Sequence, residues 1–446
     1  MKRRIAAGVL AAMMFQVGFV SAFAADMIWS YDSDSAAVTV SGYGMVNDGS
    51  PIDEYLKTAK KLTLKKGVTK IDDSVFADCG DIEEVVLPEG FLSIGKGAFG
   101  FSKSLKKINF PDTLEKIGDE AFVGCTQLEG VEIPRGTTEI GANAFTDCRL
   151  ITAFAVSEEN QNFTSVDGVI FTKDKTELVM YPPGNTAESY EIPEGTLKIC
   201  DKAFSHNESL KSVSVPDSVT QLGGYAFYFC EEFREVQLGS GVKSVGAYAF
   251  YGTKLRDILL PYGCESVGTA AFKNCELLNY VDIPATVTAP GEDIFYGTDA
   301  GLTVRGYGYA LRVYAEAAGK RFEPTVRVIV DGKELHPDRP AFITNGCTMV
   351  PMRAIFEALG ARVEWSDETK TVSSNRGDTK CTVTIGDKIL YKNGQRVELI
   401  APAMLADGRT LADGRTLVPA RAIAEAFGAK VDWDGNNGLV TVTINK

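Results

Sequence analysis

Histidine is almost absent from this chain, which has only His206 and His336 among its 446 residues. A nucleophile activated by histidine, or a metal held by several imidazoles, needs more than two such distant residues. The HExxH, CxxC, GxSxG and Walker motifs are missing as well. The sequence therefore points to no catalytic residue, no cofactor and no metal site.

Basic residues are too few to balance the acidic ones. The chain has 46 Lys and Arg against 59 Asp and Glu, which gives a net charge of −13. Phosphate backbones and anionic bilayers attract clustered positive charge. This composition therefore argues against nucleic acid or an anionic membrane surface as the partner.

Long apolar runs occur only at the N-terminus. The basic segment Lys2–Arg4 precedes an apolar stretch, Ile5–Val20, and then the small-x-small sequence Ala22–Ala24. This order is typical of a secretory signal peptide. We expect residues 1–24 to be removed and no integral membrane span to remain. With no sortase motif and no cysteine near the cleavage site, the mature chain is predicted to be secreted or held non-covalently at the cell surface.

One sequence motif, close to I-G-x-x-A-F-x-x-C-x-x-L-x-x-V-x-I-P, is repeated along the chain. Most copies are 23 residues apart, and one step of 59 residues interrupts them. A fixed period of 20–50 residues predicts a solenoid, in which stacked neighbours bury a core that one unit cannot bury alone. The Phe of each copy marks the array: Phe76, Phe99, Phe122, Phe145, Phe204, Phe227, Phe250, Phe272 and Phe295.

Nine cysteines would suggest disulfides in a secreted chain, but their spacing argues otherwise. The position three residues after each Phe holds Cys, Ser, Asn or Thr. A disulfide or a metal site would not accept these residues interchangeably. We therefore predict a buried ladder of small side chains that donate hydrogen bonds or fill space.

The long step adds a segment near residues 154–189. Within Val166–Gly184, two alternating apolar runs flank Lys173, Asp174 and Lys175. This pattern predicts a β-hairpin. It is interpreted either as a spacer between two blocks of repeats or as a dedicated binding loop.

The repeated copies of this motif resemble the BspA-like, surface-antigen type of leucine-rich repeat. The resemblance implies a solenoid of short parallel strands with a turn-rich back face over residues 67–324. It also implies an N-terminal β cap over residues 25–66, where Met27–Val46 looks like a hairpin. Members of this family are secreted and surface proteins, so the resemblance implies a binding or adhesion role.

A longer unit is written twice after the array. Met349–Trp365 and Leu417–Trp433 share 11 of 17 positions at an offset of 68 residues. Pro351 and Pro419 suit a helix start, and Gly360 and Gly428 suit a helix end. The expected order in each half is two strands, a short helix and two strands, which makes residues 326–446 a small α+β domain of two internal repeats.

The paired V-P-x-R-A-I motif of this domain resembles the copper amine oxidase N-terminal-like, or stalk, module. The resemblance implies a stalk or an attachment to the cell envelope, through a cell-wall polymer, and not catalysis. Before the second copy, the block Leu-Ala-Asp-Gly-Arg-Thr is duplicated over residues 405–416, which is read as a tolerated insertion or a functional loop. The spacing of Asp432, Asp434 and Asn436 is that of ligands in a calcium-binding loop. The sequence lacks the distal Glu of such a loop, and a simple turn after Trp433 is the alternative interpretation.

Two surfaces remain as candidates for binding. The middle residue of V-x-I is expected to face outward from the strands, as for Asn109, Glu132, Gln237 and Asp282. On the turn side, tyrosines occupy equivalent positions of neighbouring rungs, and we expect one aromatic patch, which either stabilises the array by stacking or contacts a partner. Its members are Tyr225, Tyr228, Phe229, Tyr248 and Tyr251.

The sequence thus predicts an exported, non-enzymatic protein that contacts a host or bacterial surface protein or glycan. Two alternatives stay open at this point. The array could assemble with copies of itself as a structural component of the envelope. The chain could also be an enzyme of an unrecognised type, although its 59 carboxylates show no pattern that supports a pair for glycoside hydrolysis.

Overall fold

The computed structural model describes residues 17–18, 27–47, 53–307, 309–335, 341–344, 347–405, 416–434 and 439–444. Most of the predicted signal peptide, most of the duplicated block and Asn436 lie outside these residues. Two compact units are present: Met1–Val213, Gln221–Arg234 and Gly246–Lys254 form one, and Ser214–Thr220, Glu235–Val245 and Leu255–Lys446 form the other. Within the described residues, no helix is both long enough and apolar enough to cross a membrane.

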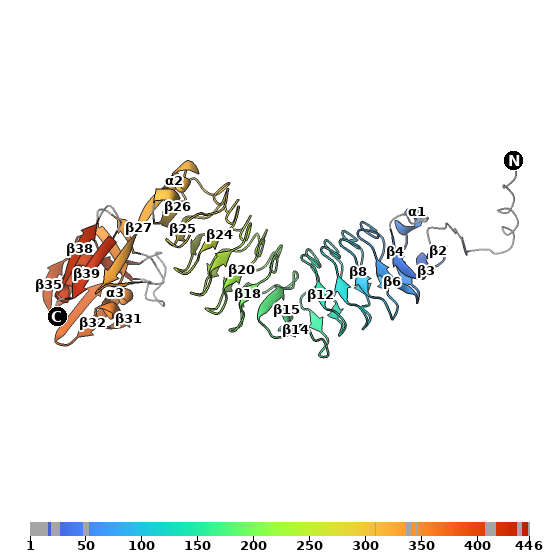
Figure 1. Ribbon diagram of the computed structural model, residues 1–446, viewed down its shortest axis with the longest axis horizontal. Coiled ribbons are helices and arrows are strands. Elements are labelled where there is room, and N and C mark those ends of the chain that lie inside the picture. The colour runs from blue at the N-terminus through green and yellow to red at the C-terminus, as the bar shows by residue number, and fades with distance from the viewer. Residues whose placement is uncertain are drawn as a thin grey trace. The chain divides into compact units, whose positions relative to one another are not determined.

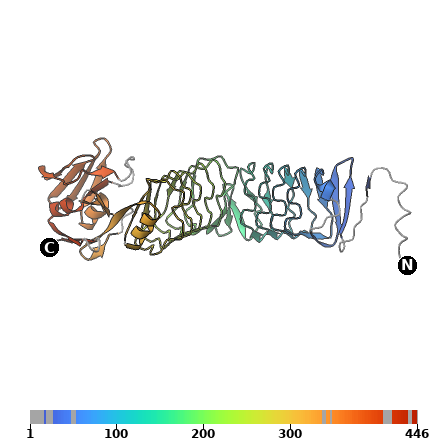
Figure 2. The same ribbon diagram turned by 90° about the horizontal axis from the view of Figure 1, so that it is seen from above.

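The repeats form a β-solenoid, as predicted, in which each rung contributes short strands to parallel ladders (Figures 1 and 2). In the first block one ladder contains β3 (Ala37–Gly42), β5 (Lys61–Leu64), β7 (Glu84–Val86) and β9 (Lys107–Ile108). The opposite ladder contains β4 (Gly44–Val46), β6 (Val68–Ile71), β8 (Ser93–Ile94), β10 (Lys116–Ile117) and β12 (Glu139–Ile140). A third pair joins β11 (Glu132–Ile133) to β13 (Ala155–Val156).

A hairpin closes the N-terminal end of this block. It joins β2 (Met27–Asp32) to β3 in antiparallel register, and β1 (Val17–Gly18) pairs with β2. Trp29, Val38 and Val40 point inward and are buried. The short helix α1 (Asp53–Leu56) follows β4. The hairpin expected from Met27–Val46 is therefore present.

The core Phe residues stack on one another from rung to rung. The rings of Phe99 and Phe122 lie 5.4 Å apart, and those of Phe122 and Phe145 lie 5.2 Å apart, both nearly parallel. The backbone N–H of Phe122 donates to the carbonyl of Ala144 in the next rung at 2.8 Å. The turn side is thus held by the same residues that fill the core.

The cysteine column is a hydrogen-bonded ladder, which confirms the prediction. The thiols of Cys125, Cys148 and Cys230 each donate to the carbonyl of the core Phe one rung earlier, at 3.0–3.2 Å. Ser102 makes the same bond with its hydroxyl, to Phe76 at 3.0 Å. The structure contains no disulfide among the nine cysteines, all of which lie in its described residues.

The inserted segment is a three-stranded antiparallel meander of β14 (Phe163–Val166), β15 (Val169–Thr172) and β16 (Glu177–Met180). β15 and β16 form the predicted hairpin around Asp174. β16 then pairs in parallel with β18 (Lys198–Ile199) and so begins the second ladder. Tyr181 takes the place of a core Phe, because its N–H donates to Ala203 and its ring lies 5.0 Å from Phe204.

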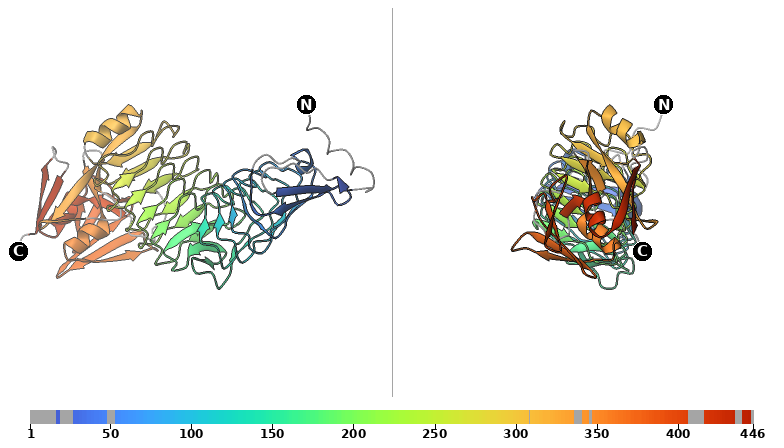
Figure 3. Two further views of the ribbon diagram at one scale, coloured as in Figure 1. Left: turned by 45° about the vertical axis from the view of Figure 1, so that its right-hand side comes forward. Right: turned by 90° about the vertical axis from the view of Figure 1, so that its left-hand side faces the viewer.

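The second block repeats the pattern with short strands (Figure 1). They are β17 (Ser189–Glu191), β19 (Ser212–Ser214), β20 (Gln221–Leu222), β21 (Glu235–Gln237), β22 (Ser244–Val245), β23 (Asp257–Leu259), β24 (Ser266–Val267), β25 (Tyr280–Ile283) and β26 (Thr303–Gly306). The helix α2 (Tyr309–Ala317), the light-orange helix of Figure 3, packs against β26 and β27 (Arg321–Val330).

β27 belongs to the last rung and to the C-terminal module at once. Its first half, Arg321–Pro324, pairs in parallel with β26. Its second half pairs with β28 (Lys333–Glu334), β29 (Ala341–Thr344) and β39 (Leu439–Ile444). The sequence placed a domain boundary at residues 324–326, and this continuous strand crosses that point without a linker.

The C-terminal module has the two predicted halves. In the first half, β29 and β30 (Cys347–Pro351) precede α3 (Met352–Ala358) and β31 (Arg362–Ser366). In the second, β36 (Met404–Leu405) and β37 (Thr416–Pro419) precede α4 (Ala420–Ala426) and β38 (Ala429–Asp434). The halves meet where β30 pairs antiparallel with β37. Gly360 and Gly428 follow the helices with φ of 78° and 79°, the left-handed conformation that ends a helix.

Candidate binding surface

Two positions in every rung of the turn side have a left-handed backbone. One lies two residues before the core Phe and the other two residues after it. Residues other than Gly, Asn and Asp seldom adopt this conformation. The first column is Ser74, Gly97, Glu120, Asn143, Lys202, Tyr225, Tyr248, Ala270 and Asp293, and the second is Asp78, Phe101, Gly124, Asp147, His206, Phe229, Gly252, Asn274 and Gly297.

Three members of the predicted aromatic patch stand in these columns. Tyr225, Phe229 and Tyr248 have φ of 58°, 51° and 56°. A bulky side chain in the left-handed region costs about 1–2 kcal/mol relative to the right-handed one. The aromatic residues are therefore placed where the backbone favours them least.

The structure brings the predicted tyrosines together. Tyr225 stacks on Tyr248 with ring centroids 4.8 Å apart, and Tyr228 stacks on Tyr251 at 5.0 Å. Phe229 meets Tyr251 edge-on at 5.2 Å. All five side chains are half-buried. We call these five residues the aromatic cluster.

Stacking decides which part of the aromatic cluster can meet a partner. Tyr225 and Tyr248 are almost parallel, at 7°, so each covers one ring face of the other. Tyr228 and Tyr251 do the same at 27°. The cluster therefore offers mainly ring edges and phenolic oxygens, which suit hydrogen bonds and edge contacts.

A histidine and a lysine border the aromatic cluster, and sequence reasoning missed both. The ring of His206 lies 5.6 Å from Tyr228 and 5.7 Å from Phe229. The ammonium of Lys202 lies 5.6 Å from the centre of the Tyr225 ring. Since Lys202 and His206 each lie 23 residues before a cluster member, the repeat period itself would have found them.

The environment of His206 favours its neutral form. Burial lowers the pKa of the imidazole, and the charge of Arg149 acts in the same direction. Asp147, Glu231 and Glu208 oppose this shift. At neutral pH His206 therefore behaves as one more aromatic ring beside the cluster.

Phe229 packs against a glycine in the next rung. A Cβ atom on Gly252 would lie only 3.1 Å from the Phe229 ring. Phe101 repeats this arrangement in the first block, where a Cβ on Gly124 would lie 2.8 Å from its ring. Phe101 is 54% exposed and has no tyrosine ladder beside it, so it is a matched control for the aromatic cluster.

The strand-side candidates differ in their exposure and in the contacts of their side chains. Glu132 and Gln237 are exposed, as expected. Asn109 is also exposed, but its side-chain amide binds both the N–H and the carbonyl of Leu87, at 2.8 and 2.9 Å. Its amide therefore ties two rungs together.

The expectation that Asp282 faces solvent is wrong, because this side chain is only 3% exposed. Asp282 on β25 stands beside Arg305 on β26, and Arg305 stands beside Glu323 on β27. Asp282 also lines a small cavity with Tyr307, Val326 and other residues of the last rungs and the C-terminal module. The strand face is thus covered where the array ends.

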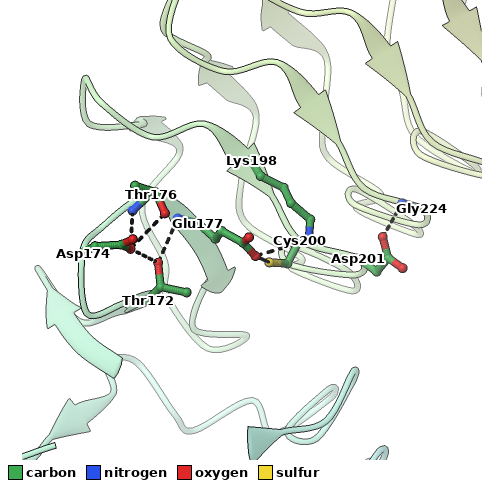
Figure 4. A network of polar contacts seen from close by, with 8 residues as sticks. All are labelled: Thr172, Asp174, Thr176, Glu177, Lys198, Cys200, Asp201 and Gly224. Atoms are coloured by element: carbon green, nitrogen blue, oxygen red, sulfur yellow. Dashed lines mark hydrogen bonds and ion pairs between the residues drawn. The ribbon is translucent and has the colours of Figure 1, made fainter. Parts of the chain in front are cut away.

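The inserted hairpin carries a polar network, shown in Figure 4. The carboxylate of Asp174 accepts hydrogen bonds from the Thr172 hydroxyl at 2.7 Å and from the N–H and hydroxyl of Thr176 at 3.1 and 2.9 Å. These bonds fix the turn between β15 and β16, and they lower the pKa of Asp174. The tip of the hairpin is therefore held in one conformation.

The same network holds a cysteine that is not prepared for nucleophilic chemistry. A carboxylate oxygen of Glu177 lies 3.3 Å from the Cys200 sulfur and 3.2 Å from the Lys198 nitrogen (Figure 4). Burial, with the hydrogen bond to Glu177 as the second cause, raises the pKa of Cys200 to about 12. A thiol in this state is a poor nucleophile at neutral pH. Across the part of the chain that the structure describes, no three His, Cys, Asp or Glu side chains are grouped to hold a metal.

Solved structures of other bacterial repeat proteins resemble the array. The pneumococcal vaccine antigen PcpA matches with a TM-score of 0.52 and 20% identity, over 68% of this chain and 98% of that one. A leucine-rich cell surface protein of Faecalibacterium prausnitzii matches with a TM-score of 0.49 and 21% identity, over 66% and 97%. A leucine-rich repeat protein of Eubacterium ventriosum matches with a TM-score of 0.48 and 20% identity, over 62% and 93%. No curated relative matches.

Two family descriptions match the sequence itself. The copper amine oxidase N-terminal domain matches residues 329–442. The BspA type leucine-rich repeat region matches residues 54–176 and 184–300 in six copies, which is more than half of the chain. The period, the stacked core and the two matches agree, and the chain belongs to the BspA type leucine-rich repeat family, with a copper amine oxidase N-terminal domain at its C-terminal end.

Proposed function

We propose that this chain is an exported, non-catalytic binding protein whose aromatic cluster contacts a protein or glycan on another surface. The C-terminal module acts as a stalk or as an attachment to the cell wall. The observation that carries this proposal is that Tyr225, Phe229 and Tyr248 occupy left-handed positions within one group of contacting rings, whereas Phe101 has no tyrosine in contact with it. Binding surfaces often contain residues with a strained backbone, because the strain is tolerated where it serves recognition.

Stability alone accounts poorly for this choice. An aromatic pair adds about 0.5–1.5 kcal/mol beyond the burial of its area. The left-handed backbone of each residue costs about 1–2 kcal/mol. Tyr225 and Tyr248 share one stacking contact but are both strained, so stacking offsets only part of the strain, which a glycine at such a position, as in Gly252, avoids.

Two further observations support an extracellular role. The N-terminal segment has the order of a secretory signal peptide, and PcpA, which shares the repeat fold, is described as a vaccine antigen.

The stacked cluster presents hydroxyls and ring edges, and tyrosines of this kind are enriched at the energetic centres of protein interfaces. A protein partner is therefore favoured over a sugar that would need an open ring face.

The test measures binding of the mature chain, from Ala25 onward, to a panel of purified extracellular matrix proteins and to a glycan array. The double variant Tyr225→Ala/Tyr248→Ala should weaken binding to any hit by at least about 30-fold, as expected for residues worth ~2 kcal/mol. Phe101→Ala should leave that affinity unchanged.

Two results would contradict the proposal. Equal affinity of the double variant and the wild type would remove the aromatic cluster from the interface. A chain that binds no probe, but whose mass in light scattering rises with concentration, would favour the self-assembling envelope component instead.

A further inference from the structure

The C-terminal module contains a second sheet with one uncovered face. Five antiparallel strands follow in order: β31, β32 (Thr371–Arg376), β33 (Thr379–Thr384), β34 (Ile389–Lys392) and β35 (Gln395–Glu398). Alternate residues, among them Val372, Val383 and Leu390, are buried in the core of the module. The residues between them point the other way, and none of these is buried: Arg362, Glu364, Ser366, Thr371, Ser373, Asn375, Lys380, Thr382, Thr384, Ile389, Tyr391, Arg396 and Glu398. We call this set the open face.

Strand register arranges the open face in rows. The central row crosses all five strands in the order Glu364, Ser373, Thr382, Tyr391 and Arg396. Beside it runs a row of Arg362, Asn375 and Lys380. On its other side, the hydroxyls of Thr371 and Thr384 lie 3.1 Å apart. The open face thus combines Ser and Thr hydroxyls, one amide and five charged side chains with one aromatic ring and one aliphatic residue, Ile389.

Tyr391 is the aromatic member and is 43% exposed. Unlike the tyrosines of the aromatic cluster, it has Thr382 and Arg396 as its cross-strand neighbours. A sugar ring can stack on such a side chain while its hydroxyls bond to nearby hydroxyls and amides. The centre of a protein interface is more apolar than this face, on which Ile389 is the single aliphatic residue.

The open face carries three cations, Arg362, Lys380 and Arg396, against two carboxylates, Glu364 and Glu398, whereas the chain as a whole is acidic. The chain carries −13, yet Arg362 and Lys380 flank Asn375 in one row, roughly 10 Å apart by strand spacing. Arg396 joins them in the central row, paired with the exposed Glu398 at 3.2 Å. Lys380 lies two residues from Thr382, the neighbour of Tyr391, which is roughly 7 Å along the strand. A carboxylate on a stacked sugar therefore falls within reach of a cation.

We propose that the open face binds peptidoglycan, a glycan that carries carboxylates, with Tyr391 beneath a sugar ring and with Arg362 and Lys380 at the carboxylates. This inference rests on the proposed role of the C-terminal module in attachment to the wall. It names the site and the polymer, and it is independent of the aromatic cluster on the repeats.

The test is co-sedimentation of the full mature chain with purified peptidoglycan from which teichoic acids and proteins have been removed. Tyr391→Ala and the double variant Arg362→Glu/Lys380→Glu should each reduce the bound fraction at least tenfold in apparent affinity. Higher salt should weaken the wild type, because charge contributes to binding. Tyr43→Ala and Lys430→Glu, at exposed sites outside the open face, should bind like the wild type.

Several outcomes would overturn the inference. The wild type could fail to sediment, the open-face variants could sediment as well as the wild type, or only a preparation that retains teichoic acid could bind, which would make a phosphate polymer the ligand. Circular dichroism of each variant shows that a loss is not unfolding. The proposal for the aromatic cluster has its own test with Tyr225 and Tyr248, so either can fail while the other stands.

Discussion

The ring of Tyr225 lies 4.8 Å from the ring of Tyr248, nearly parallel to it, although both residues have a left-handed backbone. The favourable contact and the unfavourable backbone belong to the same two residues. Because the two effects are similar in size, removing both at once should change the free energy of unfolding little. Binding and stability can therefore be separated at this site.

Tyr248→Gly should change the free energy of unfolding by less than about 1 kcal/mol, since glycine relieves the backbone strain as the stacking is lost. Phe227→Ala, in the core of the neighbouring rung, should cost about 3–5 kcal/mol. Urea denaturation of both variants provides the comparison. A loss with Tyr248→Gly as large as with Phe227→Ala would mean that the tyrosine ladder is a structural element.

The thiol ladder makes a prediction about Cys230, which is fully buried and donates to the carbonyl of Phe204. Cys230→Ser should cost less than about 1 kcal/mol because a hydroxyl serves the same acceptor, as Ser102 does for Phe76. Cys230→Val should cost about 1–3 kcal/mol because the carbonyl loses its donor. Equal stability of the two variants would show that the column only fills space.

His206 predicts a dependence of stability on pH. Its pKa is lowered in the folded chain, chiefly by burial, so the unfolded chain binds the proton more readily. Its neutral form carries no penalty well above pH 6.5, and stability is lost as the pH falls through the unfolded pKa near 6.5 toward the lower folded pKa.

The variant His206→Asn keeps a residue that tolerates the left-handed backbone and removes the titrating group. Denaturation from pH 8 to pH 5 should show the wild type losing stability relative to this variant as the pH falls. Parallel curves for the two proteins would mean that Asp147, Glu208 and Glu231 cancel the effect of burial.

Arg305 is predicted to anchor the end of the array. It pairs with Glu323 at 3.0 Å and lies 4.6 Å from the centres of both the Tyr280 and Phe342 rings. Arg305→Ala should cost about 3 kcal/mol, the low end of the range for breaking a buried pair, because Glu323 is only partly buried and keeps the exposed Arg321 as its partner.

Arg321 provides the matched control. It pairs with the same Glu323 at 3.0 Å, but its side chain is 72% exposed against 10% for Arg305. Arg321→Ala should cost at most about 1 kcal/mol. Thermal denaturation measures the loss of stability in both variants. A similar loss in Arg305→Ala and Arg321→Ala would show that Arg305 acts as a surface charge.

Periodicity carried most of the fold prediction. The 23-residue step, the alternating residues and the small side chains of the cysteine column identified the solenoid, and the apolar runs around Asp174 identified the hairpin. These signals are local or repeat at a fixed interval, so neighbouring residues suffice to interpret them. The same step predicted that Tyr225 lies beside Tyr248.

The left-handed columns and the burial of Asp282 did not follow from the sequence. The sign of φ at Tyr225 depends on how a whole turn closes against the next rung, and an aromatic residue at that position does not predict a left-handed backbone. Asp282 repeats the outward position of Gln237, yet it is buried because β26, β27 and the C-terminal module cover the end of the strand face.

The repeat, the buried Phe and Cys columns, the two-part C-terminal module and the grouping of the tyrosines could all be predicted from the amino-acid sequence, because each depends on spacing along the chain. Three features could not: which ring faces are covered, that β27 belongs to both the array and the module, and that Arg362, Lys380 and Tyr391 share one face of a sheet. Those features depend on how distant strands pair and on what covers them, and no single segment encodes that.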